Sequence, residues 1–190
     1  MHKTSAWPLA LIYTGLIVYA SLFPFADWRD QGIMPWSYLW QPFPQYWTGA
    51  DVAINLAGYA PLGFLLALAY LRTGRGASAV WMATLVALVI TAGMETLQSF
   101  LPARVPSNVD LILNVAGAWG GAISAKLLER MGALSRWARL RERWFVPDAR
   151  AALVLLALWP VALLFPVAVP LGLGQVLERL EPALVELLQD

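Results

Sequence analysis

The stretch GMETLQSFLPARVPSNVDLILNVAG, residues 93–117, decides the fold. It begins in an apolar segment with helical spacing, which Glu95 and Gln98 interrupt. A short turn with proline and arginine follows, and a second apolar segment then opens with Asp110 and Asn114. The stretch therefore predicts two apolar helices joined by a short turn, with polar side chains close to that turn.

The composition of the whole chain places these helices in a membrane. Of its 190 residues, 59% are hydrophobic and 13% are charged, and its mean hydropathy is +0.61. A soluble protein of this size needs more charge to cover its surface. The apolar residues also fall into blocks of about 20 residues, the length that spans a bilayer. The predicted fold class is an all-α, polytopic transmembrane helical bundle.

About five spans can be placed, together with interfacial amphipathic helices. The last span contains Pro160 and Pro166 and is expected to be kinked. The arginine-rich segment 130–150 predicts an amphipathic helix on the cytoplasmic surface, and the acidic segment 174–190 predicts another interfacial helix. The predicted spans cover residues 5–26, 51–71, 79–101, 109–128 and 151–169.

Lysine and arginine are distributed unequally between the loops. One side of the predicted membrane carries Lys3, Arg72, Arg75, Lys126, Arg130, Arg136, Arg139, Arg141, Arg143 and Arg150, and the other carries Arg29, Arg104 and Arg179. Cytoplasmic loops are enriched in these residues. We therefore predict a multi-pass protein with a cytoplasmic N-terminus, whose first and third loops face outward.

The first outer loop, residues 27–50, is rich in aromatic residues. Its rings prefer the membrane–water boundary, where the ring is half-buried and its polar atom remains hydrated. We predict that the loop lies along this boundary as a lid, for which plain anchoring is favoured over a sugar- or lipid-binding platform. The aromatic residues are Trp28, Trp36, Trp40 and Trp47, with Tyr38 and Tyr46.

Polar side chains recur at the outer ends of three predicted helices. Those of the second and fourth spans share one helix face through spacings of four residues, and those of the third through a spacing of three. Because they lie at similar depth, we expect them to converge on one outward-facing pocket. The candidate ligand-binding residues are Asp51, Asn55, Tyr59, Glu95, Gln98, Arg104, Asp110 and Asn114.

The energetics of charge in a membrane indicate how this set is held. A lone carboxylate at mid-bilayer costs about 2.5–3.5 kcal/mol, so such groups are paired, hydrated or protonated. Arg104 is the cation expected to pair with the carboxylates, which alternatively bind a divalent cation. The Gly117-x3-Gly121 stripe predicts close helix packing. The competing interpretation is that these groups are interhelical bonds or caps, with Asn108 or Asp110 capping the fourth helix.

Several classes of site are excluded or disfavoured. The chain has no cysteine, which excludes thiol nucleophiles and cysteine metal ligands. Its one histidine, His2, lies at the N-terminus, so histidine catalysis is not expected. We predict no metal and no cofactor. No basic patch with interleaved aromatic residues indicates a nucleic-acid partner, and the oligomeric state is left open.

Three ordered motifs resemble the VanZ-like family of bacterial membrane proteins. They are D-x3-N-x2-G-Y-x-P-L-G-F (51–64), E-x2-Q-x5-R (95–104) and D-x3-N-x2-G-x3-G (110–121), preceded by YASLFPF (19–25). The resemblance covers residues 10–128. It implies a four-helix VanZ-like core over 1–128. Beyond the resemblance lie the basic segment 129–150 and a region 151–190 with the fifth span and the acidic tail, and this span is supported by hydropathy alone. The family is named for a protein associated with resistance to teicoplanin.

The leading functional hypothesis is a protein of the bacterial cytoplasmic membrane whose outward pocket binds a lipid-linked or amphiphilic envelope ligand. The resemblance connects it with glycopeptide tolerance. The expected partners are membrane lipids and a lipid-linked envelope precursor. A second hypothesis is a membrane enzyme that acts on a polyprenyl phospholipid with Glu95 as general base. A third is a transporter or proton relay that uses Glu95.

Overall fold

The computed structural model describes residues 4–44, 48–144, 155 and 159. The elements in these ranges are all helical, which confirms the all-α prediction. The predicted fifth span and acidic tail lie outside the described residues, apart from positions 155 and 159. The elements are α1 (Ala6–Leu22), the 3₁₀ helix η1 (Ser37–Trp40), α2 (Gly49–Arg72), α3 (Ala79–Gln98), α4 (Asn108–Arg130) and α5 (Ala133–Trp144).

Three of these helices, α2, α3 and α4, are long and apolar enough to cross a membrane. They coincide with the second, third and fourth predicted spans. Helix α1 is apolar but has 17 residues, which gives a length of about 26 Å. The sequence predicts that this span continues to residue 26. The helix ends at Leu22 instead, because Pro24 disfavours helical geometry in the residue before it.

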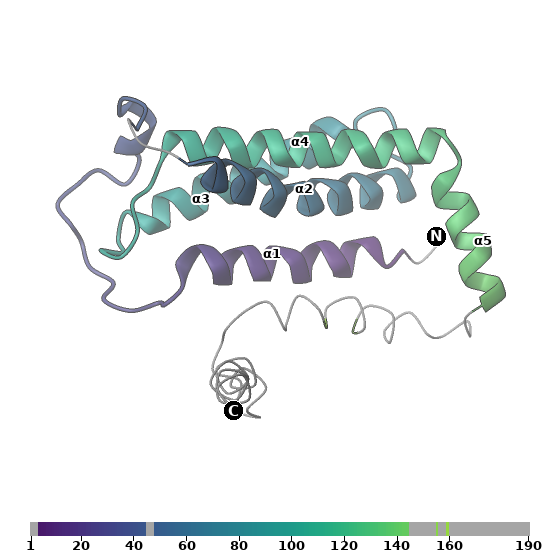
Figure 1. Ribbon diagram of the computed structural model, residues 1–190, viewed down its shortest axis with the longest axis horizontal. Coiled ribbons are helices and arrows are strands. Elements are labelled where there is room, and N and C mark those ends of the chain that lie inside the picture. The colour runs from purple at the N-terminus through teal and green to yellow at the C-terminus, as the bar shows by residue number, and fades with distance from the viewer. Residues whose placement is uncertain (1–3, 45–47, 145–154, 156–158, 160–190) are drawn as a thin grey trace, which may run out of the picture. The chain divides into compact units, whose positions relative to one another are not determined.

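Helices α1 to α4 pack side by side in alternating directions (Figure 1). The most extensive contact joins the parallel helices α2 and α4, and α3 packs against both. Helix α1 packs against α2 in the opposite direction, since the Trp7 and Tyr70 rings meet edge to face at 5.1 Å. We call the end where α1 and α3 finish and α2 and α4 begin the polar end. The opposite end, which carries Arg72, Lys126 and Arg130, is the basic end.

The contact between α2 and α4 is a backbone contact. A Cβ atom on Gly117 would collide with the carbonyl of Leu56, and one on Gly121 with the carbonyl of Ala60. From the other side, a Cβ on Gly63 would collide with the backbone of Ala118. Small residues permit such close approach in membrane helices. The prediction that the glycine stripe of the fourth span brings two helices together is confirmed.

The loop between α1 and α2 is fastened onto the polar end. The backbone N–H of Arg29 donates to the Phe100 carbonyl at 3.0 Å, and the Gln31 side chain donates to the Ser99 carbonyl at 2.7 Å. Asn108 donates from its side chain to the Gln41 carbonyl at 2.7 Å. These bonds tie the loop to the end of α3 and the start of α4.

The aromatic residues of this loop divide into two groups. Trp28, Trp36 and Trp40 are exposed, as expected of rings at a membrane–water boundary. Tyr38 is instead 2% exposed, and its hydroxyl donates to the Ala92 carbonyl at 3.3 Å. The expectation that Tyr38 lies at the boundary is therefore wrong, because this ring anchors η1 to α3. Tyr46 and Trp47 lie outside the described residues.

Helix α5 lies within the basic segment predicted at 129–150. It begins just after Gly132, whose φ of +69° belongs to the left-handed region that glycine adopts readily. The helical state of this segment agrees with the prediction, and its position on the membrane surface stays a prediction.

Candidate functional site

The start of α2 is closed by its own residues. Thr48 precedes the helix, and its hydroxyl oxygen accepts a hydrogen bond from the Asp51 backbone N–H at 3.2 Å. In return, the Asp51 carboxylate accepts from the Thr48 backbone N–H at 2.8 Å. This reciprocal capping box satisfies two backbone donors that a helix start leaves free. Asp51 is exposed, and its role here is that of a cap.

The start of α4 is closed differently, with a residue from α3. The Ser107 hydroxyl accepts from the Asp110 backbone N–H at 3.4 Å, so Ser107 is the N-cap residue of α4. The prediction that Asn108 or Asp110 caps this helix is wrong. The Ser107 backbone N–H donates to the Glu95 carboxylate at 2.8 Å. Glu95, which is 3% exposed, therefore accepts a hydrogen bond from the backbone N–H of the N-cap residue, as Asp51 does at the start of α2.

Because Glu95 serves as that acceptor, Asp110 is free to bond elsewhere. Its carboxylate accepts from the Asn55 side chain at 3.0 Å, and the same Asn55 nitrogen donates to the Asp51 backbone carbonyl at 3.0 Å. The Asp110 carboxylate lies within electrostatic range of both Asp51 and Glu95. Three acidic groups from three helices thus gather at the polar end.

A second layer of polar groups lies deeper in the bundle. The Asn114 side chain donates to the Thr91 hydroxyl at 2.9 Å, and both residues are buried. The Asn114 side-chain carbonyl and the Tyr59 hydroxyl are buried and have no hydrogen-bond partner among the described residues. Thr91 lies beside the Tyr59 hydroxyl without the geometry of a regular hydrogen bond, and Glu95 lies within electrostatic range of it. Most buried polar groups in proteins are satisfied, so these two atoms call for an explanation.

Gln98 and Arg104 do not join the acidic groups. The Arg104 guanidinium donates to the Phe23 carbonyl at 2.8 and 3.2 Å and to the Ala20 carbonyl at 3.0 Å. The Gln98 side chain donates to the Ser21 carbonyl at 3.0 Å. The expectation that the carboxylates orient Arg104 is wrong. The last carbonyls of α1 lack partners within their own helix, and these two side chains supply them.

Of the eight candidate residues, six are therefore linked through hydrogen bonds or electrostatic contact. With Thr91 and Ser107 they form what we call the polar cluster. Its members are Asp51, Asn55, Tyr59, Thr91, Glu95, Ser107, Asp110 and Asn114.

Thr48 and Ser107 were not among the candidate residues. A signal for both is present, because each is a hydroxyl residue three positions before an aspartate at the start of an apolar run. That spacing is typical of a helix N-terminus. This spacing indicates both caps, but it does not indicate that Glu95 replaces Asp110 as acceptor.

Among the described residues, the three acidic groups do not have the arrangement of a metal site. Within residues 4–44 and 48–144, no group of three or more histidine, cysteine, aspartate or glutamate side chains is arranged to hold a metal ion. The alternative in which the carboxylates bind a divalent cation is therefore not supported. The cluster instead presents carboxylate groups, which accept hydrogen bonds, and amide and hydroxyl groups, which both donate and accept them.

Comparison with known proteins identifies the family. No curated protein and no solved structure matches the chain. The family model described as VanZ/LLP1 matches residues 6–129, which is more than half of the chain and includes every member of the polar cluster. The apolar helices agree with a protein of the membrane. The chain is a membrane protein that belongs to the VanZ/LLP1 family.

Proposed function

We propose that the polar cluster binds the head group of a lipid-linked or amphiphilic ligand of the bacterial cell envelope. In this proposal the chain crosses the cytoplasmic membrane several times, its N-terminus is cytoplasmic, and the polar end faces outward. The excess of lysine and arginine at the N-terminal segment and basic end supports this orientation. The loop tied across the polar end, with its exposed tryptophans, lies where such a head group would enter.

The observation that carries the proposal is the pair of buried polar atoms without partners among the described residues, Tyr59 Oη and Asn114 Oδ1. Leaving one such atom unsatisfied costs about 1–3 kcal/mol. Helix packing alone does not require these polar atoms, because Phe in place of Tyr59 and Leu in place of Asn114 would fill similar space without the cost. A ligand group that bonds to both atoms removes the cost when it binds.

The chemistry of the cluster selects the ligand group. Asn114 Oδ1 and the Glu95 carboxylate both accept hydrogen bonds, and the Tyr59 hydroxyl both donates and accepts. Hydroxyl and ammonium groups suit this arrangement, as found in sugar and aminoacyl head groups. A phosphate does not suit it, because the cluster has acidic groups but no cation, since Arg104 donates instead to the carbonyls at the end of α1.

Removal of a single atom tests the proposal. We would purify the full chain with Tyr59→Phe in nanodiscs of bacterial envelope lipids and identify the retained amphiphiles by mass spectrometry. The wild type should retain a head group with hydroxyl or amine functions. Tyr59→Phe should retain it about fivefold less, from the loss of roughly 1 kcal/mol. Its unfolding temperature without ligand should be unchanged or higher, since an unsatisfied group has been removed.

A matched variant controls for general damage. Tyr13→Phe removes a hydroxyl that is already bonded, to the Gly58 carbonyl at 2.9 Å. It should lower stability slightly and leave retention unchanged. If Tyr59→Phe and Glu95→Gln both retain the amphiphile as the wild type does, the cluster serves helix packing alone. If polyprenyl phosphate is converted to a product and Glu95→Gln abolishes this, the protein is an enzyme rather than a binding protein.

The connection with glycopeptides forms part of the same proposal. Expression of the wild type in a susceptible bacterium should raise the minimal inhibitory concentration of teicoplanin. Tyr59→Phe should fail to do so although it is inserted at an equal level, because the pocket no longer engages its ligand. An equal increase with both proteins would separate tolerance from the polar cluster.

A further inference from the structure

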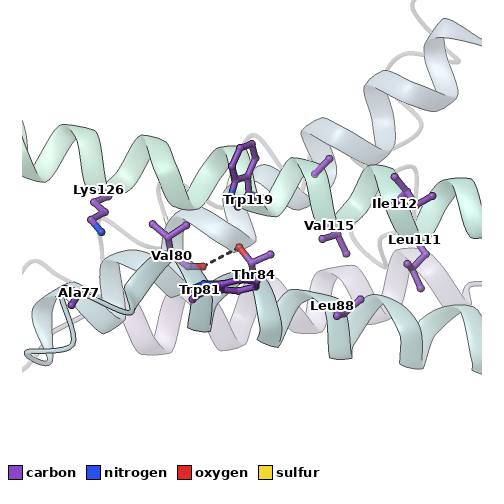
Figure 2. A pocket seen from close by; sticks show the side chains of 11 residues that line it. Ala77, Val80, Trp81, Thr84, Leu88, Leu111, Ile112, Val115, Trp119 and Lys126 are labelled. Carbon is purple, nitrogen blue, oxygen red and sulfur yellow. Dashed lines mark hydrogen bonds between the residues drawn. The ribbon is translucent and has the colours of Figure 1, made fainter.

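A groove runs between α3 and α4, along a face that the polar cluster does not use (Figure 2). Its volume is about 640 Å³, within the range of about 300–1,000 Å³ that is typical of small-molecule sites. Val80, Trp81 and Leu88 of α3 line one wall, and Ile112 and Trp119 of α4 line the other. We call this feature the α3–α4 groove.

The middle of the groove is apolar. Thr84 lies among its lining residues, but the Thr84 hydroxyl donates to the Val80 carbonyl of its own helix at 2.9 Å (Figure 2). It therefore offers no free donor to an occupant. Trp81 is 79% exposed and Trp119 is 54% exposed, so the two largest rings stand open along the groove. The lining of this central part is therefore mainly apolar, which favours a hydrocarbon occupant.

The walls of the groove are unsuited to another helix. Helices in membranes pack through small residues that let backbones approach, as Gly117 and Gly121 do against α2. The groove instead presents tryptophan, leucine, isoleucine and valine side chains. A flexible chain can follow such an uneven wall, whereas a rigid helix would contact only its highest points.

One charged side chain lies at the basic end of the groove. Lys126 is among the lining residues (Figure 2), and no acidic side chain is among the described residues that line it. Ionisable groups in membrane helices are rare and normally have a partner. An anion that enters with the hydrocarbon occupant can supply this partner. Lysine binds phosphate as a compact point charge.

We propose that the α3–α4 groove holds an acyl chain of an anionic phospholipid whose phosphate lies at Lys126. From Lys126 to Leu111 the groove extends over about 22 Å of helix. One leaflet of the hydrocarbon core is about 15 Å thick, so a chain anchored at the basic end remains within the groove along its length. The inference does not depend on the polar cluster, because none of its members lines the groove and Lys126 lies at the opposite end of α4.

The test uses the full chain in nanodiscs of phosphatidylcholine with phosphatidylglycerol, and native mass spectrometry of retained lipid. The wild type should prefer phosphatidylglycerol. Lys126→Gln should reduce this preference about fivefold, the change expected for one basic residue near anionic lipid. Trp81→Ala should reduce retention of both lipids, because it removes part of the hydrocarbon wall.

Arg130→Gln is the matched control. Arg130 lies four residues further along α4, is exposed, and is not among the described lining residues of the groove. It should leave the preference for phosphatidylglycerol intact. An equal loss in Arg130→Gln would attribute the preference to general surface charge and overturn the proposal. Lys126→Gln with the preference of the wild type would overturn it as well.

A second copy of the chain is the rival occupant. Because the chain has no cysteine, Leu88→Cys introduces a single thiol in the groove. Oxidation in membranes should leave this variant monomeric when lipid fills the groove. Efficient formation of a disulfide-linked dimer would show that another copy lies there, and would replace the lipid.

Discussion

Helices α2 and α4 begin with the same sequence pattern, and the structure uses the pattern in two ways. Each helix has a hydroxyl residue, an aspartate, an asparagine and a glycine at identical spacings. In α2 the aspartate is exposed, and it closes a capping box with the hydroxyl residue. In α4 the asparagine and glycine are buried. The two sets are Thr48, Asp51, Asn55 and Gly58, and Ser107, Asp110, Asn114 and Gly117.

The difference arises from what lies beside each helix. The backbone N–H of Thr48 finds its acceptor in Asp51, within the same turn. The equivalent N–H of Ser107 finds its acceptor in Glu95 of α3. Asp110 is thereby released to bind Asn55, and the start of α4 becomes tied to both neighbouring helices. A local motif thus fixes which groups are available, and the tertiary neighbours decide which bonds form.

The largest difference between the two helix starts should appear at their glycines. A Cβ on Gly117 would collide with the Leu56 backbone, whereas Gly58 faces open space among the described residues. Gly117→Ala should therefore destabilise the bundle by about 1–3 kcal/mol through overpacking. Gly58→Ala should be neutral, or stabilising by up to about 1 kcal/mol, because alanine favours the helix.

Thermal unfolding in detergent, followed by tryptophan fluorescence, measures both variants. The comparison is internal, because the two substitutions add the same methyl group at the same motif position. Equal unfolding temperatures would mean that α2 and α4 move apart to accommodate the added methyl group at little cost in free energy. The close backbone contact would then contribute little to stability.

The next largest effect concerns Glu95, which replaces Asp110 as the acceptor for the Ser107 N–H. In Glu95→Ala the Ser107 N–H loses its partner, and Asp110 should turn to it as Asp51 does to Thr48. The bond from Asn55 to Asp110 is then already broken. Asn55→Ala should cost about 0.6–1.7 kcal/mol in the wild type, the range for interhelical hydrogen bonds in membranes, and close to nothing in Glu95→Ala.

A double-mutant cycle measures this coupling directly. Unfolding free energies of the wild type, the two single variants and the double variant give the interaction between Asn55 and Glu95, which share no hydrogen bond with each other. Additive costs would show that Asp110 keeps its bond to Asn55 when Glu95 is absent. The exchange of capping partners would then not occur.

The sequence predicted the helices well and their partners poorly. The spans 51–71, 79–101 and 109–128 match α2, α3 and α4 within a few residues, because bilayer-length apolar runs and proline-rich turns are strong signals. Convergence of Asn55 and Asp110 also followed from depth and helix face. These properties depend on residues that are close together in the sequence.

Errors arose where a side chain reaches a distant segment. The position of Arg104 in the turn between the third and fourth spans places it at the polar end, but it does not show that Ala20 and Phe23 present unsatisfied carbonyls there. The carboxylates were the obvious partners by charge alone. Tyr38 lies in a proline-rich loop without periodicity, so its burial against α3 had no signal in the sequence.

The smallest expected effect concerns the hydroxyl caps themselves. Thr48→Ala removes an acceptor for the Asp51 N–H at 3.2 Å and a donor to the Asp51 carboxylate at 2.8 Å. It should cost about 0.5–1 kcal/mol, within the range for N-cap substitutions. Ser107→Ala removes a single bond of 3.4 Å, which is longer than an ordinary N–H···O bond, and leaves the Ser107 N–H bonded to Glu95. It should cost only a few tenths of a kcal/mol.

Amide hydrogen exchange at Asp51 and Asp110 measures these caps more directly than global unfolding does, because helix ends open locally. Exchange should accelerate more at Asp51 in Thr48→Ala than at Asp110 in Ser107→Ala, and Thr48→Ser should restore protection. A larger acceleration of exchange at Asp110 than at Asp51 would have a different physical cause. Asp110 is less exposed than Asp51, so a larger effect at α4 would show that burial of an unsatisfied N–H outweighs the length of the bond. The deeper position of the α4 start, rather than its borrowed acceptor, would then be what distinguishes the two helices.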